Sequence, residues 1–573
     1  MISPSAATIQ QQLTQPGAPF EVATDEQTGL AYYKNAATNL AVMINDARRE
    51  DDELFLVYQH QRWSYRDFYQ RVDRTAAFLQ DHGVTPGQRV AIAMRNRPEW
   101  CVFFVATVLI GAIPAPLNSF GLGEELSVAI DDIAADVLIC DQMRFKRIAN
   151  TRQQLPKLTV CLYRNSADEQ DTLAPYPHLN GIVNAQHVFA HANTQWTLGQ
   201  RSGDQQALIL FTSGATNRAK AVVSSHNAVC QALFNINFIA AISAMASPTT
   251  IASIQQQALA PVALTAVPLF HVSGLHAQLL SGLLSSRRLV FIRKWHPDAA
   301  LALMEQEKVT VFNGAPAMTM QLMRHPEFTS GAIGQRIAGL GFGGAGIPRK
   351  LIAKVRHSMA NKMVGIGYGM TETNGVAAAG SGQIFFHQPY ASGLISPIMQ
   401  VRIKRADGSI GDIGDVGEIQ LKGVTLLTGY VDSQNGVTSP LDSDGWLSTG
   451  DIGYIDEDNY LFVVDRLKDM INRAGENISA AEVECCLLQH DDVIEAGVTG
   501  IKDDELGEVV VAVVNKLPAS DVSESDLIAF CSQHLAAYKV PCKVVLTEQP
   551  LPRNPAGKLV KNQLKQSFIQ PNQ

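Results

Sequence analysis

The chain has 573 residues, which is too long for a single hydrophobic core and predicts at least two domains. Hydrophobic residues make up 46% of the sequence and charged residues 17%, which is typical of an ordinary globular protein. The formal net charge is -8 and the longest basic run is the short RFKR of residues 144–147, so the sequence excludes nucleic acid as an expected partner.

The first part of the chain alternates between helix and strand patterns. Residues 64–83 predict an amphipathic helix that begins at a Ser-x-x-Asp capping pattern and ends at Gly83. A strand is expected at residues 89–94, then a helix that begins at Pro98, then another strand at residues 136–140. This alternation predicts an α/β fold, with parallel-type sheets covered by helices.

We expect no secretory signal and no integral membrane segment. The N-terminus lacks a basic stretch followed by an apolar one. Residues 100–117 are strongly apolar, but Gly111 and Pro114 stop the helical part after about a dozen residues, against the ~20 that a bilayer requires. The eight cysteines show neither C-x-x-C nor Cys/His ligand spacing, so we expect reduced thiols, no structural zinc and a cytoplasmic location.

The second part of the chain has a different texture. Short β-rich segments separated by Gly and Asp turns predict a small β-barrel-like subdomain over about residues 376–464. From residue 469 a compact α+β pattern follows, with helices at 480–490 and 525–535 and strands at 493–501, 508–514 and 543–546. We therefore expect an N-terminal domain of residues 1–467 and a small mobile C-terminal domain of residues 468–573.

Residues 207–226, ALILFTSGATNRAKAVVSSH, predict a strand that runs into a phosphate-binding loop. The apolar run ends at Phe211, and the loop after it supplies hydroxyl groups, backbone donors and the positive charge of Lys220. Ala219 and Ala221 flank this lysine, so the loop does not match a Walker motif. Taken alone, such a loop is as readily an ordinary surface turn as a phosphate site.

Residues 339–344, GLGFGG, formally satisfy the G-x-G-x-x-G pattern of a dinucleotide-binding turn. No acidic residue lies ~20 positions further on to hold a ribose, as that site would require. The pattern therefore does not indicate a dinucleotide.

The phosphate-loop segment and six further stretches, in this order, resemble the signature motifs of the adenylate-forming superfamily, which contains acyl-CoA synthetases, luciferases and peptide-synthetase adenylation domains. The six are PLFHVSG at 268–274, GFGGAGIP at 341–348, YGMTET at 368–373, TGD at 449–451, DRLKDMINRAGENI at 465–478 and PRNPAGK at 552–558. Together they span most of the chain, and the resemblance is to the acyl-CoA synthetase and fatty-acid–CoA ligase branch.

The resemblance implies a role for individual residues. Glu372 would hold Mg²⁺, Thr371 would contact the α-phosphate and Asp451 would accept the ribose hydroxyl groups. Arg466 would assist at the ribose or phosphate, and His271 would contact the substrate carboxylate and gate its pocket. The other implied nucleotide contacts are Thr212, Ser213, Gly214, Thr216, Lys220, Gly344, Ala345, Gly367, Tyr368, Gly369 and Met370.

The resemblance also implies a reaction in two steps with a domain rotation between them. Lys558 would bridge the carboxylate and the α-phosphate during adenylation. The small domain would then rotate about Lys468 and bring the loop at Gly475 beside the thiol tunnel. Taken singly, an Asp is usually a turn former, a Lys a solvated residue and a His a satisfied loop residue, so these roles depend on the ordered set of motifs.

The implied activity is the ATP-dependent activation of an apolar carboxylic acid, fatty or aryl, to acyl-AMP and pyrophosphate, followed by transfer to CoA. ATP, Mg²⁺ and coenzyme A are the expected cofactors, and a homodimer is left open. A ligase that loads an acyl-carrier protein remains an alternative. So does a nucleotide-binding pseudoenzyme, because the phosphate loop departs from the family pattern at Ala215, Asn217, Ala219 and Ala221. Ile366 replaces a polar residue common in aryl-CoA ligases and predicts an apolar pocket wall.

Overall fold

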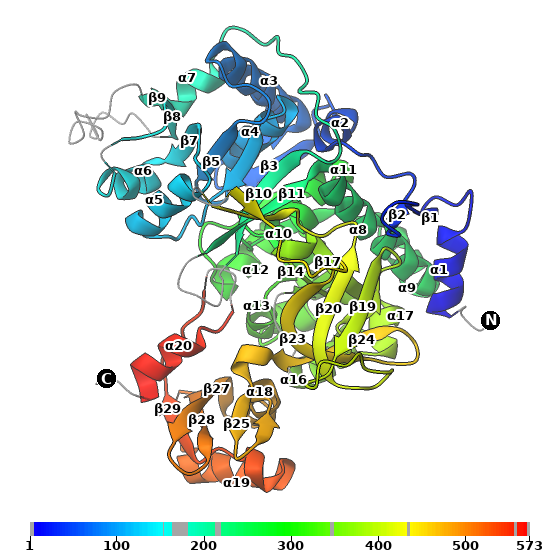
Figure 1. Cartoon of the computed structure of the whole chain (residues 1–573), viewed down its shortest axis with the longest axis vertical. Helices are drawn as coiled ribbons and strands as arrows, with labels where there is room; N and C mark the ends of the chain where they lie inside the picture. The colour runs from blue at the N-terminus through cyan, green and yellow to red at the C-terminus, as the bar shows by residue number, and fades with distance from the viewer. Residues whose placement is uncertain are drawn as a thin grey trace.

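The computed structural model describes residues 5–152, 154–162, 182–212, 219–343, 349–432, 436–518, 520–554 and 558–569. A large part built on several sheets occupies most of the molecule, and the C-terminal elements form a smaller body at one end (Figure 1). The α/β fold class predicted from the sequence is confirmed.

A five-stranded parallel sheet forms the core of the first part of the chain. Its order is β6 (Ile113–Pro116), β5 (Arg89–Ala93), β7 (Val137–Asp141), β8 (Leu158–Leu162) and β9 (Ile182–Asn184). The helices of this region are α4 (Pro98–Leu109), α5 (Gly123–Asp132), α6 (Gln142–Ala149) and α7 (Ala185–Phe189). Every residue of α4 is buried, as we predicted for this apolar stretch.

Helix α3 (Tyr65–Asp81) forms where its capping pattern predicts it. The Ser64 hydroxyl group accepts a hydrogen bond from the Asp67 backbone N–H, and the Asp67 carboxylate accepts one from the Ser64 N–H. This reciprocal cap satisfies two donors at the start of the helix. The predicted apolar face, with Phe68 and Val72, is fully buried.

The largest sheet has 13 strands, and four of the seven predicted motifs begin on its strands, at residues 341, 368, 449 and 465. Its order is β19 (Met399–Lys404), β20 (Gly417–Gly423), β23 (Leu447–Ile455), β24 (Tyr460–Arg466), β18 (Gly393–Ile395), β17 (Gly375–Ser381), β16 (Met363–Met370), β15 (Gly339–Gly343), β14 (Val311–Gly314), β12 (Val262–Thr265), β13 (Arg288–Phe291), β3 (Leu54–Tyr58) and β4 (Gln61–Ser64). Strands β3, β13, β12, β14, β15 and β16 are parallel, so their carboxyl ends meet at one edge. Most strands of the β-rich residues 376–464 continue this sheet through antiparallel pairs, whereas residues 429–432 and 436–438 belong to a separate four-stranded sheet.

A four-stranded antiparallel sheet supports the phosphate-loop segment. Its order is β10 (Gln206–Thr212), β11 (Lys220–Ser225), β21 (Gly429–Asp432) and β22 (Gly436–Thr438). Helix α8 (His226–Ala246) follows β11 directly. Among the described helices α8 is long and apolar enough to cross a membrane by length and composition, yet 56% of its most apolar window is buried inside the protein.

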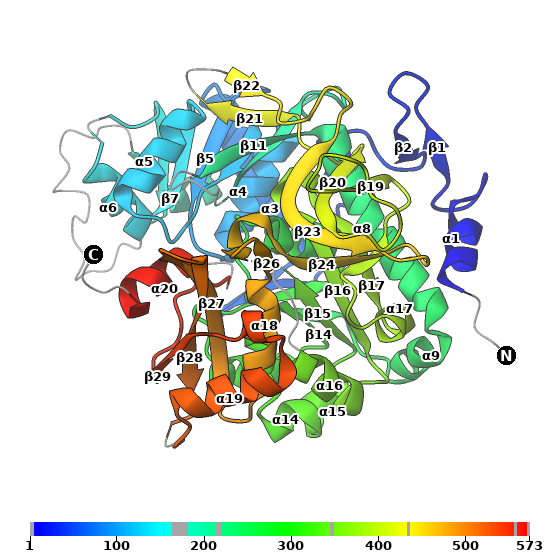
Figure 2. The same ribbon diagram turned by 60° about the horizontal axis from the view of Figure 1, so that its bottom comes forward.

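The C-terminal body contains a five-stranded sheet of β26 (Glu476–Ile478), β25 (Ile471–Arg473), β28 (Gly507–Lys516) and β27 (Val493–Asp503), with β29 (Lys543–Thr547) paired to β28. Helices α18 (Ala480–Leu487) and α19 (Glu524–His534) complete the predicted α+β pattern. Figure 2 shows this body against the side of the molecule that carries β23 and β24. The functional boundary at residues 467 and 468 stays a prediction.

The Asp465 carboxylate joins β24 to the start of α18. Its Oδ2 accepts hydrogen bonds of 2.8 Å from the Ser479 hydroxyl group and 3.0 Å from the Ala481 backbone N–H. A carboxylate at a helix N-terminus is stabilised by the unpaired N–H groups there. The two parts of the chain are therefore held together by a charge-assisted contact in this arrangement.

The other elements are α1 (Ala6–Thr14), β1 (Val22–Thr24), β2 (Ala31–Tyr33), α2 (Leu40–Asp46), α9 (Pro248–Gln256), α10 (Val272–Gly274), η1 (Leu275–Leu280), α11 (Ser281–Leu284), α12 (Pro297–Gln306), α13 (Pro316–Leu322), α14 (Pro326–Thr329), α15 (Ala332–Arg336), α16 (Arg349–Ser358), η2 (Thr371–Thr373), α17 (Gln383–His387), η3 (Leu467–Asp469), η4 (Ala537–Lys539), α20 (Lys561–Leu564) and η5 (Lys565–Ile569).

Candidate active site

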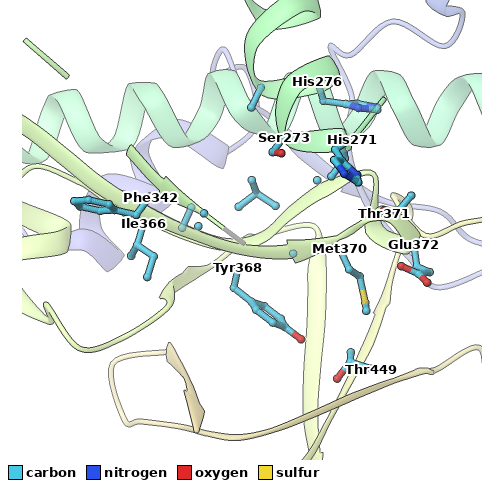
Figure 3. A pocket seen from close by; sticks show the side chains of 18 of the residues that line it. His271, Ser273, His276, Phe342, Ile366, Tyr368, Met370, Thr371, Glu372 and Thr449 are labelled. Atoms are coloured by element: carbon cyan, nitrogen blue, oxygen red, sulfur yellow. The ribbon is translucent and has the colours of Figure 1, made fainter. Parts of the chain in front are cut away.

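A cavity of about 880 Å³ lies where the carboxyl ends of β14, β15 and β16 meet helix α8, strand β23 and the C-terminal body. Most of the predicted site residues within the described chain line it, and Figure 3 labels five of them, His271, Tyr368, Met370, Thr371 and Glu372. The predicted residues that line the cavity are Thr212, Lys220, His271, Gly367, Tyr368, Gly369, Met370, Thr371, Glu372, Arg466, Lys468 and Lys558. The same cavity is thus lined by Thr212 and Lys558, which lie 346 positions apart in the sequence.

Strand β16 needs glycine because its neighbour β17 approaches closely. A Cβ atom on Gly369 would lie 1.6 Å from the Gly375 carbonyl oxygen, and one on Gly365 would lie 2.6 Å from Ser381 Cβ. Neither position tolerates a side chain without movement of the backbone. The exposed backbone of this strand therefore forms a flat wall of the cavity.

The Asp451 carboxylate, 4% exposed, is bound on both oxygens. The Tyr368 hydroxyl group donates a hydrogen bond of 2.8 Å to Oδ2, and Arg466 Nε lies 3.0 Å from Oδ1. Burial, and then the Asp451 charge, raises the pKa of Tyr368 well above its usual value, so the phenol stays protonated and donates. Asp451 does not itself line the cavity, but its two partners do.

The Glu372 side chain is held by Tyr430 on β21. The Tyr430 hydroxyl group donates a hydrogen bond of 3.0 Å to Glu372 Oε1, and Lys220 Nζ lies 4.7 Å from the centre of the Tyr430 ring. The Leu427 backbone N–H donates to the Glu372 carbonyl oxygen at 2.8 Å. Sequence reasoning missed Tyr430, because it lies in none of the recognised motifs and reaches the cavity through strand pairing with β11.

The donor set fits a magnesium ion that is bound mainly by phosphate oxygens and water. No group of three or more His, Cys, Asp or Glu side chains with metal-binding geometry occurs among the described residues. Mg²⁺ usually retains several waters and takes one or two carboxylates with substrate phosphates. Glu372 supplies such a carboxylate beside Lys220, at the end of the cavity where phosphates are expected.

The Lys558 side chain enters the cavity from the C-terminal body. Its backbone N–H donates a hydrogen bond of 2.9 Å to Asn554 Oδ1, and the Asn554 N–H donates one of 2.8 Å to the Lys558 carbonyl oxygen. Burial lowers the pKa of Lys558; the charge of Arg466 lowers it further, whereas Asp451 and Glu372 raise it. The ammonium group is therefore within electrostatic reach of both acidic site residues.

The His271 imidazole is neutral at physiological pH. Burial, and then the positive charge of Lys558, lowers the pKa of His271 to about 4. Its Nε2 is buried and has no hydrogen-bond partner in the described structure. A neutral ring next to Lys558 has a free hydrogen-bonding group to offer to a bound substrate.

Two further polar side chains line the cavity, from the π-helical segment η1, and sequence reasoning missed both. His276 is fully buried, and neither ring nitrogen has a hydrogen-bond partner. Gln278 is 2% exposed; its Nε2 donates to the Asn313 carbonyl oxygen at 3.3 Å, and its Oε1 has no partner. The signal in the sequence is two polar residues inside the otherwise apolar run LHAQLL.

The remaining wall is apolar, as Ile366 led us to expect. Ile366 lies beside Phe342 in the β15–β16 pair, and Val267 and two isoleucines of α8, Ile236 and Ile239, also line the cavity. This wall makes room for a bulky or extended hydrocarbon group.

Some predicted residues are not brought into the cavity. Gly475 lies in the turn between β25 and β26 with φ of +89° and is not among the lining residues. The predicted contacts Ser213, Gly214, Thr216, Gly344 and Ala345 lie outside the described residues. Their roles therefore stay predictions.

Two protein-family profiles match this chain. The profile described as AMP-binding enzyme matches residues 44–431, and the profile described as AMP-binding enzyme C-terminal domain matches residues 482–558. The first match alone covers more than half of the chain.

Two curated relatives are similar over nearly the whole chain. The chain is 29% identical to 3-[(3aS,4S,7aS)-7a-methyl-1,5-dioxo-octahydro-1H-inden-4-yl]propanoyl:CoA ligase of Rhodococcus jostii, with 91% of this chain and 97% of the relative covered. It is also 29% identical to the long-chain-fatty-acid–CoA ligase FadD13 of Mycobacterium tuberculosis, with 88% and 93% covered.

Two solved structures have the same fold. ATP-bound MatB from Rhodopseudomonas palustris superposes with a TM-score of 0.78 at 26% identity, covering 92% of this chain and 98% of that one. The o-succinylbenzoate coenzyme A synthetase MenE from Bacillus subtilis, in complex with ATP and a magnesium ion, superposes with a TM-score of 0.69 at 25% identity, covering 91% and 98%.

Proposed function

Because the chain belongs to the AMP-binding enzyme family, we propose that it activates an apolar carboxylic acid, fatty or aryl, with ATP and transfers the acyl group to CoA. It is an AMP-forming acyl-CoA synthetase of the adenylate-forming superfamily, with ATP, Mg²⁺ and CoA as cofactors. The observation that carries the proposal is one cavity that has cations and acids at one end and an apolar wall elsewhere.

At the polar end we assign the nucleotide. Asp451 accepts the ribose hydroxyl groups, positioned by Tyr368 and Arg466, which already bind both of its oxygens. Glu372 is the protein ligand for Mg²⁺, and when bound this ion neutralises phosphate charge. The flat backbone wall of β16 at Gly367 and Gly369, with Met370 and Thr371, faces the nucleotide.

In the first step a carboxylate oxygen attacks the α-phosphorus of ATP and pyrophosphate leaves. Both reactants are anions, so the barrier comes largely from charge repulsion and alignment, and no strong base is needed. Lys558 supplies a positive charge between the carboxylate and the phosphate, with Lys220 and Arg466 nearby. The neutral His271 donates a hydrogen bond to the carboxylate and sets its orientation.

In the second step the CoA thiol attacks the acyl carbonyl carbon, and AMP leaves. Lys558 fills the polar end of the cavity in this structure, whereas Gly475 lies outside it. We propose that rotation about Lys468 exchanges the two. The Asp465 contacts with Ser479 and Ala481 hold the present, adenylating arrangement and break on rotation.

The test is a panel of aliphatic and aromatic acids in a pyrophosphate-release assay, followed by measurement of AMP release with and without CoA. We expect medium-chain, long-chain or ring-containing acids to be activated well and acetate poorly, because acetate leaves the apolar wall empty. AMP release that depends on CoA supports the synthetase; transfer to an acyl-carrier protein instead would replace it with the carrier-protein ligase. If acetate exceeds every larger acid, the apolar-acid proposal is wrong.

A further inference from the structure

Two polar side chains of η1, His276 and Gln278, line the cavity in addition to the apolar wall. The His276 ring nitrogens and Gln278 Oε1 are buried and have no hydrogen-bond partner in the described structure, and both residues line the cavity. A buried polar atom without a hydrogen-bond partner is destabilising, so native proteins rarely retain one unless a ligand or a water molecule supplies the partner. Two such side chains on one π-helical segment indicate a ligand group, because π-helical turns are frequent at functional sites.

The position of these groups favours the acyl body over the nucleotide. His271, next to Lys558, marks the place of the reacting carboxylate. His276 lies five residues further on, near the start of the π-helical segment η1, which follows α10 directly. Figure 3 shows His276 and His271 on the helical side of the cavity, across from the strand that carries Ile366 and Tyr368. Gln278 reaches the end of β14 through Asn313, on the side of the apolar wall.

The charges in the cavity decide what kind of ligand group is suitable. The cations among the described lining residues are Lys220, Arg466, Lys468 and Lys558. All four lie at the nucleotide end. Lys220 Nζ lies over the ring of Tyr430, and the Tyr430 hydroxyl group binds Glu372. Arg466 pairs with Asp451, and Lys558 is close enough to Arg466 and Lys468 for their charges to lower its pKa.

His276 adds no positive charge to the apolar side, because burial lowers the pKa of His276 to about 3. A second carboxylate there would be buried without a counter-ion, which is costly. An uncharged oxygen, in contrast, can accept from a neutral imidazole N–H, and a hydroxyl group can also donate to an amide oxygen.

We propose that the acyl body of the substrate carries an uncharged oxygen, as a ketone or a hydroxyl group, which His276 and Gln278 recognise by hydrogen bonds. The proposal rests on the proposed function and narrows its substrate class to oxygenated apolar monocarboxylic acids. His276 and Gln278 are then specificity-determining residues, and Asn313 positions Gln278 through its carbonyl oxygen.

The experiment compares matched acids in ATP–pyrophosphate exchange, which needs no CoA. The probes are octanoate, the 4-, 5-, 6- and 7-oxo and hydroxy derivatives of octanoate, and octanedioate. For the wild-type enzyme we expect kcat/KM to exceed that of octanoate by about tenfold or more at one or two oxygen positions, because a site built to hydrogen-bond a group rejects the analogue that lacks it. Octanedioate should be the poorest acid of this length.

The variants His276→Phe and Gln278→Met keep the size of each side chain and remove its hydrogen bonds. In each variant, the ratio of kcat/KM for the oxygenated acid to kcat/KM for octanoate should fall toward one. The control His357→Phe makes the same exchange on the exposed surface of α16 and should keep the wild-type ratio. If His276→Phe fails to fold, the Gln278→Met variant and the wild-type comparison of octanoate with its oxygenated derivatives still test the proposal.

Three results would overturn the proposal. The first is that no oxygenated derivative is a better substrate than octanoate, and the second is an unchanged preference in both variants. The third is normal exchange in both variants with a defect confined to the KM for CoA, measured separately by CoA-dependent AMP release, which would assign these groups to the pantetheine arm. Exchange with octanoate but without an oxygen preference removes this inference alone. No exchange with any acid removes the proposed function itself.

Discussion

The Tyr430 hydroxyl group donates a hydrogen bond of 3.0 Å to Glu372 Oε1, although Tyr430 lies on β21 of the four-stranded sheet and Glu372 lies in η2, which follows β16 of the largest sheet. Burial, and then the charge of Glu372, raises the pKa of Tyr430 well above its usual value, so the phenol remains a donor throughout the working pH range. The same ring lies beneath Lys220 Nζ. One aromatic residue therefore positions both the proposed magnesium ligand and a proposed phosphate-binding cation.

This relationship predicts different defects for the two partners. Glu372→Gln should slow adenylation about a hundredfold or more, since the anionic ligand is lost. Tyr430→Phe should slow it about tenfold, because one hydrogen bond to a charged group is lost and the carboxylate remains. ATP–pyrophosphate exchange across a magnesium titration measures both. Near-normal exchange by Glu372→Gln at saturating Mg²⁺ would remove Glu372 from the site.

Lys558→Ala should separate the two half-reactions. We expect adenylation to fall about a hundredfold or more, because the charge that offsets carboxylate–phosphate repulsion is lost. Conversion of supplied acyl-adenylate and CoA to the thioester should be spared. Lys543→Ala, an exposed lysine on β29 of the same body, is the matched control and should leave both steps unchanged. Equal loss of both steps by Lys558→Ala would contradict the assignment.

Asp465→Asn should weaken the adenylating arrangement specifically. The substitution removes the charge that accepts from Ser479 and from the start of α18, a contact of the kind that contributes about 1 kcal/mol. Adenylation should fall about fivefold, with thioester formation unchanged or faster. Stopped-flow measurement of each half-reaction tests this, with the exposed Asp504→Asn as control. Parallel loss of both steps would mean a general structural role.

The opposite defect is expected from the hinge and from the loop at Gly475. Lys468→Pro restricts φ at the proposed hinge and should stop thioester formation while adenylation stays within severalfold of wild type. Gly475→Leu should do the same by obstructing the thiol. Because Gly475 has φ of +89°, any side chain there also strains the turn, so Gly475→Ala is the control for strain alone. If Ala and Leu behave alike, obstruction is not the cause.

The buried His276 predicts a dependence of stability on pH. Its pKa is about 3 in the folded protein and ~6.5 when unfolded, so below pH 6.5 protons bind the unfolded chain first. Its contribution is full above pH 6.5 and is lost toward pH 3, by about 1.4 kcal/mol per pH unit. His276→Phe should flatten the dependence of the urea midpoint on pH between 6 and 4.5. An unchanged slope would mean that His276 is protonated when folded.

Much of the fold could be predicted from local sequence signals. The cap at Ser64 and Asp67 fixes the start of α3, and Pro98 opens α4, because these signals act within a few residues. The C-terminal helices and strands form close to the predicted bounds for the same reason. The 13-stranded sheet could not be predicted, because its strand order depends on pairings between distant segments such as β18 and β24.

The candidate site likewise contains residues that the sequence predicts and residues that it does not. Motif residues such as Lys558 and Thr371 meet in one cavity, which the order of the motifs implied. Tyr430, His276 and Gln278 lie outside the informative positions of any motif, and their importance comes from burial and missing partners. Such properties exist only once the chain is folded, so only the three-dimensional arrangement reveals them.

The close approach of Gly369 to Gly375 has a consequence for how enzymes of this design diversify. A Cβ atom on Gly369 would lie 1.6 Å from a carbonyl oxygen, so mutation cannot reshape that stretch of β16. New substrates must then be accommodated on the facing helical wall, where side chains of Ser273, Ala277 and Gln278 line the cavity. Directed evolution of this enzyme should therefore concentrate its libraries on Ser273 and Ala277. It should leave Gly365, Gly369 and also Gly274 unaltered, because a Cβ atom on Gly274 would lie 2.1 Å from the Pro268 carbonyl oxygen.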